Sequence, residues 1–286
     1  TNGYHGLTLG SLAITSNAHY RNDAFLDRSN ASFLPFDGYL GYGVDTIAHI
    51  RKLLVDSSSG LGLPAAIVAE TVQAEGGVQV ARVAWLQDLS ALCREFGILL
   101  IVDDIQVGCG RTGTFFSFEA ADIQPDIIVL SKAISGYGLP MSLVLMRPEL
   151  DQWKRGEETA TFRGHNLAFV TATEAIGYWE TEDFAREIRA KGATVSQRLE
   201  ELCQSLPGAG LRHRGYGLIQ GLELPDPAVA AAVVRHAFAG GLIIELCGPG
   251  NNVLKLLPPL VIEADELDEG LSILERSLRS AIADPT

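Results

Sequence analysis

Two charged residues stand at the ends of two expected strands: Asp103 follows the apolar run 98–102, and Lys132 follows the run 126–131. Short unbroken apolar runs are typical of parallel strands buried on both faces, and open α/β sheets bind ligands at the carboxyl ends of such strands. We therefore expect Asp103 and Lys132 to meet in one crevice. Pyridoxal phosphate (PLP) chemistry needs this pair: an amine that holds an aldehyde as a Schiff base and a carboxylate that keeps a pyridine nitrogen protonated. The alternative is a lysine that is merely solvated or ion-paired at a strand end.

More polar side chains follow the same strands. In the stretch Asp103-Asp-Ile-Gln, Ile105 could cover one face of a planar ring while Gln106 reaches a ring oxygen, although a solvated strand-to-loop corner has the same composition. Glu70 closes another apolar run, and Glu75 follows it in a Gly-flanked loop. Paired carboxylates also occur in glycosidases, but no aromatic sugar platform accompanies this pair.

Other chemical motifs are absent or lie in the wrong context. The stretch Gly108-Cys-Gly-Arg-Thr-Gly matches a dinucleotide fingerprint, yet it leads into Thr114-Phe-Phe-Ser-Phe and not into a helix whose N-terminus could meet a pyrophosphate. The six histidines lack metal-ligand spacing, and no Gly-x-Ser-x-Gly elbow is present. We therefore expect neither a metal centre nor a serine nucleophile.

The elements that must position these residues alternate as in an α/β protein. Expected strands at 65–70, 98–102, 126–131 and 141–146, with a helix over 85–96, predict a mostly parallel sheet. A different texture follows: a charged amphipathic helix over 184–206, strands within 211–224 and 242–262, and a closing helix over 264–282. The prediction is a large domain over 1–170 and a smaller α+β domain over 171–286.

Composition narrows the class of partner. The net charge of −13 disfavours nucleic acid and anionic membranes, which require a basic face. No apolar run approaches the roughly 20 residues that cross a bilayer. The four scattered cysteines suggest neither a disulfide framework nor a zinc site. We expect a cytoplasmic protein that acts on small molecules.

Taken together, these motifs resemble the class III (ω) PLP-dependent aminotransferases of PLP fold type I, and the resemblance runs along essentially the whole chain. It implies a large domain like that of aspartate aminotransferase. Tyr4 and His5 resemble the segment whose aromatic ring stacks on the pyridine, and the stretch from Glu70 to Gly77 resembles the family's Glu-Pro-x-Gln-Gly-Glu-x-Gly.

The resemblance also implies residue roles. Asp103 would pair with the pyridinium nitrogen, Ile105 would sandwich the ring, Gln106 would bond its phenolic oxygen, and Lys132 would be the Schiff-base lysine. Thr161 falls on the threonine that crosses a homodimer interface to bind the partner's cofactor phosphate.

Two residues are implied to contact substrate. Glu75 and Lys255 fall where relatives keep a Glu–Arg bridge that opens for the second carboxylate of glutamate or 2-oxoglutarate. Lys255 is one of three departures from the family pattern, with Ala74 in place of Gly and Asp104 in place of Glu.

Within the family, the stretches 135–140, 149–154 and 161–164 resemble the aminotransferases that exchange 2,4-diaminobutyrate and 2-oxoglutarate in ectoine, siderophore and related diamine pathways. The expected reaction moves an amino group from L-glutamate to aspartate 4-semialdehyde, in a homodimer or dimer of dimers. The alternatives are another ω-aminotransferase, acting on ornithine, 4-aminobutyrate or another diamine, and an inactive paralogue that serves as a dimerisation or regulatory module. The resemblance further predicts that an N-terminal, phosphate-cradling part of the family chain is missing here.

Overall fold

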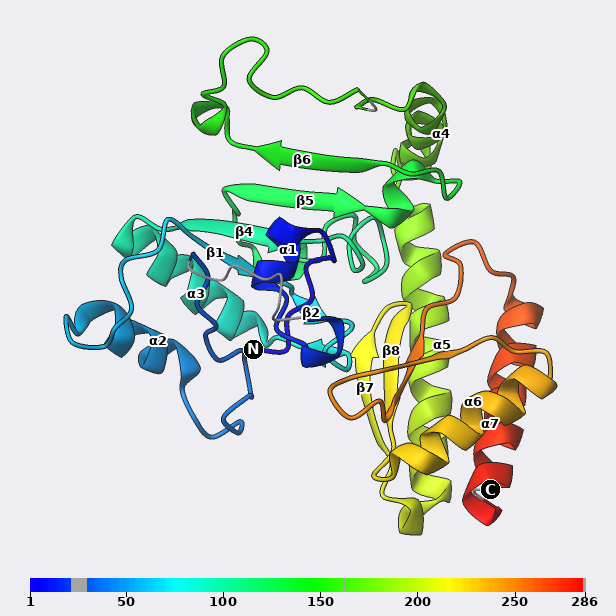
Figure 1. Cartoon of the computed structure of the whole chain (residues 1–286). Coiled ribbons are helices and arrows are strands. Elements are labelled where there is room, and N and C mark those ends of the chain that lie inside the picture. The colour runs from blue at the N-terminus through cyan, green and yellow to red at the C-terminus, as the bar shows by residue number, and fades with distance from the viewer. Residues whose placement is uncertain (22–29, 162, 285–286) are drawn as a thin grey trace.

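The computed structural model describes residues 1–21, 30–161 and 163–284. Two four-stranded sheets are connected through α4 and the long helix α5, which runs alongside β7 and β8 of the second sheet (Figure 1). The first sheet has the strand order β1-β4-β5-β6. Its strands are β1 (Ala66–Ala69), β4 (Leu99–Asp103), β5 (Ile127–Ser131) and β6 (Ser142–Met146). Strands β1, β4 and β5 are parallel and β6 is antiparallel to β5, so the prediction of a mostly parallel α/β sheet is confirmed.

The α-helices of the first half, blue to cyan in Figure 1, are α1 (Leu9–Ile14), α2 (Thr46–Val55) and α3 (Val83–Phe96). Helix α3 packs on β4, and α2 packs on α3. Helix α3 buries Leu89 and Leu92 against the strand residues Leu100 and Val102 in one apolar cluster. It ends at Gly97, whose φ of 66° is a left-handed conformation that glycine adopts without steric cost. The chain therefore turns directly into β4 and delivers Asp103 to its far end.

The second sheet is antiparallel, with the order β7-β8-β10-β9. Its strands are β7 (Arg212–Tyr216), β8 (Ile219–Glu223), β9 (Glu245–Cys247) and β10 (Val253–Leu256). Helices α5 (Asp183–Ser205), α6 (Pro227–Ala239) and α7 (Ala264–Ala283) pack on it. Helix α4 (Asn166–Gly177) leads into α5 from the top of the molecule in Figure 1.

The two sheets are joined by direct contacts as well as by the chain. A short hairpin of β2 (Val72–Gln73) and β3 (Gln79–Val80) shares an apolar cluster with Ile219 and Val253 of the second sheet. The loop after β4 adds backbone hydrogen bonds, because Leu218 N donates to Arg111 O at 2.8 Å. This packing brings Glu75, in the hairpin turn, next to β10. The proposed domain boundary at residue 170 stays a prediction.

Short 3-10 helices complete the chain at Ala18–Tyr20, Glu119–Ala121, Lys132–Ser135, Pro148–Leu150 and Pro207–Ala209. None of the helices in the described ranges is both long and apolar enough to cross a membrane.

Candidate active site

Asp103 and Lys132 lie at the carboxyl ends of neighbouring parallel strands. Asp103 is the last residue of β4 and pairs in register with Val129 of β5, and Lys132 begins the short helix that follows β5. Both line one cavity of about 180 Å³. Its other lining residues are Tyr4, His5, Gly6, Glu70, Ala74, Glu75, Ile105 and Gln106. The structure thus gathers residues from the N-terminal segment, the β2–β3 turn and the ends of β4 and β5 around one space.

The backbone at Lys132 is strained. Its φ is 52°, in the left-handed region that residues with a side chain seldom adopt. Such outliers persist where the surrounding structure fixes them, and they gather at functional sites. The turn is held by Ser131, whose hydroxyl donates to Met141 O at 2.7 Å. Lys132 thus lines the same cavity as Asp103 at the end of the strand.

Burial lowers the pKa of Lys132, while the charges of Glu75, Asp103 and Glu70 oppose this change and that of Lys255 adds to it. The residue has substantial exposed surface because it borders open cavities, yet the surrounding protein still disfavours its charged form. A lowered pKa increases the fraction of free amine, which is the nucleophilic form.

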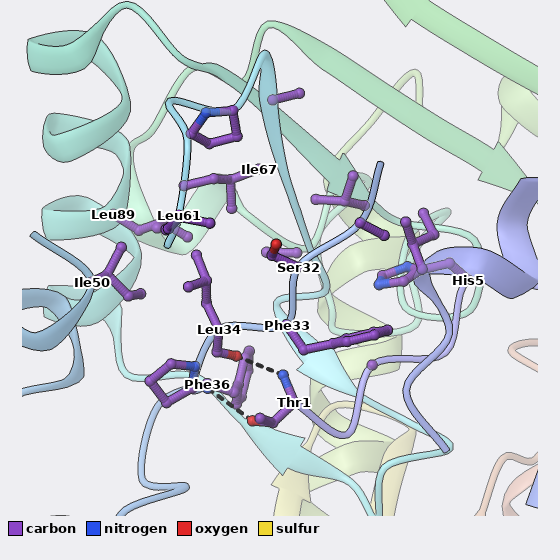
Figure 2. A pocket seen from close by; sticks show the side chains of 18 of the residues that line it. Thr1, His5, Ser32, Phe33, Leu34, Phe36, Ile50, Leu61, Ile67 and Leu89 are labelled. Carbon is purple, nitrogen blue, oxygen red and sulfur yellow. Dashed lines mark hydrogen bonds between the residues drawn. The ribbon is translucent and has the colours of Figure 1, made fainter. Parts of the chain in front are cut away.

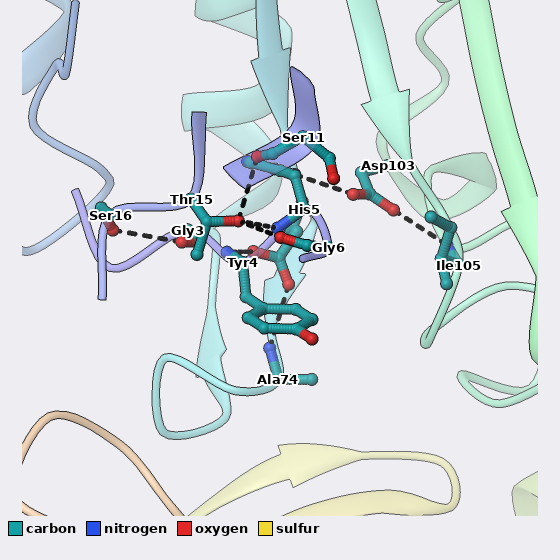
Figure 3. Close-up of polar contacts among 11 residues, drawn as sticks. Gly3, Tyr4, His5, Gly6, Ser11, Thr15, Ser16, Ala74, Asp103 and Ile105 are labelled. Atoms are coloured by element: carbon teal, nitrogen blue, oxygen red, sulfur yellow. Dashed lines mark hydrogen bonds and ion pairs between the residues drawn. The ribbon is translucent and has the colours of Figure 1, made fainter. Parts of the chain in front are cut away.

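The Asp103 carboxylate is buried and held by two donors. Its Oδ2 lies 2.7 Å from His5 Nδ1, and its Oδ1 accepts a hydrogen bond from Ile105 N at 3.1 Å. Figure 3 shows the His5 ring turned toward Asp103. Burial opposes protonation of His5, but the hydrogen bond to Asp103 and the charge of Glu70 outweigh it and raise the pKa of His5.

Glu70 ties the N-terminal segment to the β2–β3 turn. Its carboxylate accepts from Tyr4 N at 3.0 Å and from Ala74 N at 3.3 Å. Burial raises the pKa of Glu70 to about 7, although His5 and the hydrogen bond from Tyr4 act in the opposite direction. Thr15 fixes the same segment, because its hydroxyl accepts from His5 N at 2.9 Å and donates to Gly6 O at 3.0 Å (Figure 3).

Glu75, Gln106 and Lys255 form a second polar cluster beside the first. Lys255 Nζ contacts Glu75 Oε1 and lies 3.4 Å from Gln106 Oε1, while Gln106 Nε2 donates to Glu75 Oε1 at 3.1 Å. The Lys255 side chain is only 2% exposed. Burial opposes ionisation of Glu75, but the bond and charge of Lys255 and the bond from Gln106 lower its pKa.

A larger cavity of about 910 Å³ adjoins this cluster. It shares Glu75, Ile105, Gln106 and Lys132 with the smaller cavity and adds Lys255 to its wall. The amine of Lys132 is therefore reachable from a space large enough for an amino acid, and the ion pair of Glu75 with Lys255 borders that space.

A third cavity, of about 330 Å³, lies on the other side of His5 and Glu70 (Figure 2). Its wall is largely apolar, with Leu34, Ile67 and Leu89 among its side chains, and Thr1 is fixed there by hydrogen bonds to Leu34 and Phe36. The described residues that line it include no lysine.

Thr161 is the one predicted site residue that lies apart. It is exposed in the segment before α4 and borders none of the cavities described above. Its predicted role concerns a partner chain and stays a prediction. In the other direction, sequence reasoning missed that His5 contacts Asp103 and that Gln106 contacts both members of the Glu75–Lys255 pair. No local pattern signals these contacts, because their partners lie 98, 31 and 149 residues apart.

Comparison with known proteins agrees with this geometry. The chain is 56% identical over 278 residues to a diaminobutyrate--2-oxoglutarate transaminase of Wolinella succinogenes, covering 97% of this chain and 65% of that protein. It is 56% identical over 286 residues to the protein of the same name in Bordetella parapertussis, with 99% and 66% covered. The chain thus spans about two thirds of the length of these relatives.

Solved structures share the fold. The ornithine aminotransferase of Toxoplasma gondii, in which PLP partially occupies the active site, superposes with a TM-score of 0.81 at 28% identity, covering 100% of this chain and 64% of that one. The chain therefore has the fold of these aminotransferase structures. The family described as aminotransferase class-III matches residues 1–278, and the chain belongs to this PLP-dependent family.

The residues present fit the ring end of PLP. The cavity offers a buried carboxylate for a ring nitrogen, an apolar side chain for a ring face and an amine for an aldehyde, supplied by Asp103, Ile105 and Lys132.

Proposed function

We propose that this chain carries the catalytic lysine and the substrate-binding residues of an aminotransferase acting on L-glutamate and L-aspartate 4-semialdehyde, with L-2,4-diaminobutyrate and 2-oxoglutarate as products. The observation that carries the proposal is the convergence of Asp103 and Lys132 on one cavity that is bordered by the Glu75–Lys255 pair. The names and the 56% identity of the two relatives support the choice of substrates.

The chemistry that bound PLP supplies is an amine-reactive aldehyde joined to an electron-withdrawing ring. Lys132 would hold that aldehyde, and its lowered pKa favours the free amine that this requires. The same amine would move a proton to or from the substrate carbon. The carboxylate of Asp103, which contacts His5, would face the ring nitrogen and hold a proton there. Tyr4 and Ile105, which line the cavity, would enclose the ring, and Gln106 would donate to the ring oxygen.

Glu75 and Lys255 supply the substrate selectivity. Glutamate presents a second carboxylate to the site, whereas diaminobutyrate presents an amino acid head group. The same site must therefore present a different charge to each of these two amino donors. In the closed pair Glu75 neutralises Lys255, and separation of the two exposes a cation for the carboxylate of glutamate or 2-oxoglutarate. Lysine presents a point charge where arginine presents a bidentate fork, so carboxylate binding is expected to be looser than in relatives with arginine.

The proposal includes a homodimer or a dimer of dimers in the cytoplasm. Helix α4 exposes Leu167, Val170 and Ile176, and apolar surface of this kind is typical of subunit interfaces. Thr161 precedes the same helix, so an interface there would carry Thr161 toward the cofactor phosphate of the partner. The described cysteines are all free thiols, in keeping with a reducing compartment.

Ornithine is the second candidate substrate. The likeness to the Toxoplasma gondii ornithine aminotransferase favours it, but at half the sequence identity of the diaminobutyrate relatives. A paired assay with aspartate 4-semialdehyde and glutamate 5-semialdehyde as amino acceptors distinguishes the two.

The decisive experiment is the replacement of Lys132. Lys132→Ala is expected to abolish covalent cofactor attachment and glutamate-dependent formation of diaminobutyrate, since Lys132 is the lysine that lines both cavities at a strand end. Borohydride reduction of the wild-type protein with PLP, followed by peptide mapping, should place the label on Lys132. Lys154→Ala, in the loop after β6, is the control and should keep both properties. A label on Lys52, Lys154 or Lys255 would refute the assignment.

A further inference from the structure

Gln106 is the side chain that touches both members of the Glu75–Lys255 pair. Its amide nitrogen donates to Glu75 Oε1 at 3.1 Å, and its amide oxygen lies 3.4 Å from Lys255 Nζ. It also borders both the cavity that contains Asp103 and the larger cavity that contains Lys255. Gln106 therefore connects the cofactor-holding residues with the substrate-selective pair.

Separation of Glu75 from Lys255 leaves the carboxylate of Glu75 without its cationic partner. The carboxylate sits where burial disfavours its charge, and Lys255 is the strongest influence that keeps it ionised. When a substrate carboxylate takes Lys255, Glu75 loses that partner. An ionised group left partly buried without a donor is costly, so the open state requires a second donor close by.

Gln106 already occupies the position of that donor. In the closed state, Lys255 Nζ and Gln106 Nε2 share one acceptor, Glu75 Oε1. Two hydrogen bonds to one acceptor oxygen weaken each other. The hydrogen bond from Gln106 therefore stabilises the carboxylate of Glu75 more strongly after Lys255 has moved away. A side chain that stabilises the open state more than the closed state shifts the equilibrium toward the open state.

We propose that Gln106 is a positioning residue that retains Glu75 when Lys255 is engaged by the second carboxylate of a dicarboxylic substrate. Gln106 thereby favours glutamate and 2-oxoglutarate over substrates with one carboxylate. This inference rests on the proposed function of the Glu75–Lys255 pair, and it goes beyond a contact of Gln106 with the cofactor ring.

The test measures binding and not turnover. Glutarate has two carboxylates and pentanoate has one, and neither has an amino or oxo group to react. Calorimetric titration of the PLP-loaded protein with each acid gives two affinities per variant. Gln106→Met keeps the length of the side chain but removes its hydrogen bonds. Gln197→Met is the matched control, because Gln197 Nε2 donates to Glu201 at 2.8 Å on the exposed face of α5.

The expected result is a loss of glutarate affinity on the order of tenfold in Gln106→Met, as for a buried acceptor that loses its donor, with pentanoate affinity nearly unchanged. Gln197→Met should change neither affinity. In a Glu75→Gln background the further change Gln106→Met should have no effect on glutarate, because no carboxylate remains to be retained. Should Gln106→Met fail to fold, Gln106→Asn keeps the amide on a shorter side chain and should show the same selective loss.

Three results would overturn the inference: equal losses for glutarate and pentanoate, no loss for either acid, or a loss that persists in the Glu75→Gln background. Failure of the proposed function looks different. A wild-type protein that binds glutarate through Gln106 but does not transfer amino groups would refute the aminotransferase activity and leave the role of Gln106 intact. A wild-type protein that transfers amino groups while its Gln106→Met variant binds normally would refute only the role of Gln106.

Discussion

At the scale of single residues, the carboxylate of Asp103 is the group on which the proposed chemistry depends. Asp103 is 6% exposed, and its carboxylate contacts His5 and the backbone N–H of Ile105. Asp103→Asn preserves the size of the side chain but removes its charge, so the ring nitrogen loses the anion that keeps it protonated. We expect PLP to remain bound and the rate of amino transfer to fall by roughly 10²-fold or more.

The measurement is a single-turnover rate with glutamate, alongside the PLP content of the purified protein. Asp268→Asn on α7, which removes one charge of an ion pair with Arg198 on α5, is the control and should keep the wild-type rate. A rate for Asp103→Asn close to the wild type would contradict the role given to this carboxylate.

Glu70 leads to a pH prediction. Its pKa is about 7 in the folded chain and near 4.5 when exposed, so between these values the folded state holds a proton that the unfolded state has lost. Folding stability that comes from Glu70 is therefore complete below pH 4.5 and is lost as the pH rises to about 7. The free energy of unfolding should fall by on the order of 3 kcal/mol across this range relative to Glu70→Gln, whose side chain does not titrate.

Denaturant unfolding at several pH values, with wild type and variant compared at each, checks the sign. The exposed residue Glu201 on α5 supplies the control, since Glu201→Gln should leave the pH dependence as it is. Parallel curves for wild type and Glu70→Gln would mean that the buried carboxyl does not titrate in this range.

The sequence was sufficient to predict the positions of Asp103 and Lys132, but not the contact of His5 with Asp103. The positions of Asp103 and Lys132 followed from the strands that end there, because parallel neighbours place their carboxyl ends at one edge. The contact of His5 with Asp103 depends on how the first segment folds back over the sheet. No sequence pattern within a few residues of either side chain indicates how this segment folds back.

At the scale of elements, helix α5 crosses the second sheet with a glycine at the contact. A Cβ on Gly192 would lie 2.6 Å from the carbonyl oxygen of Gly217, in the turn between β7 and β8. That turn also bonds Arg111, in the loop after β4. Gly192 therefore lets the helix, the second sheet and the first sheet's loop approach one another.

Gly192→Ala tests this close approach. In an open helix position, alanine stabilises relative to glycine by up to about 1 kcal/mol. At Gly192 the backbone of Gly217 must shift, so we expect a net loss of roughly 1–3 kcal/mol in the free energy of unfolding. Gly177→Ala, at the end of α4 with open space around its Cβ position, is the control and should be neutral or stabilising. A stabilised Gly192→Ala would show that the contact is looser than described.

Long elements in which apolar residues recur at a regular spacing can be predicted from the sequence. Short elements without such a spacing cannot. Helix α5 was expected over 184–206 and spans Asp183–Ser205, since its apolar residues recur at helical spacing over many turns. The β2–β3 hairpin has only two residues in each strand and no such period. Its pairing comes from packing against the second sheet, which lies more than a hundred residues later in the chain.

At the scale of the whole molecule, the candidate site lies where the two sheets meet. The first sheet supplies Asp103 and Lys132, the hairpin supplies Glu75, and β10 of the second sheet supplies Lys255. Asp103 and Lys132 thus belong to one sheet, whereas the Glu75–Lys255 contact joins the hairpin to the second sheet, against which the hairpin packs.

The proposed homodimer is the property of the whole molecule that a single surface change can test. Val170 on α4 is 68% exposed, and Leu167, one turn earlier on the same helix, is also exposed. Val170→Asp places a charge in this apolar surface, and desolvation of that charge in an interface is costly. We expect the variant to be monomeric by sedimentation, and to lose PLP more readily if Thr161 binds the partner's cofactor. Val55→Asp is the matched control, because Val55 is 64% exposed at the end of α2, away from this apolar surface. A Val170→Asp variant that stays dimeric, or a monomer with full transfer rate and PLP content, would contradict an interface at α4.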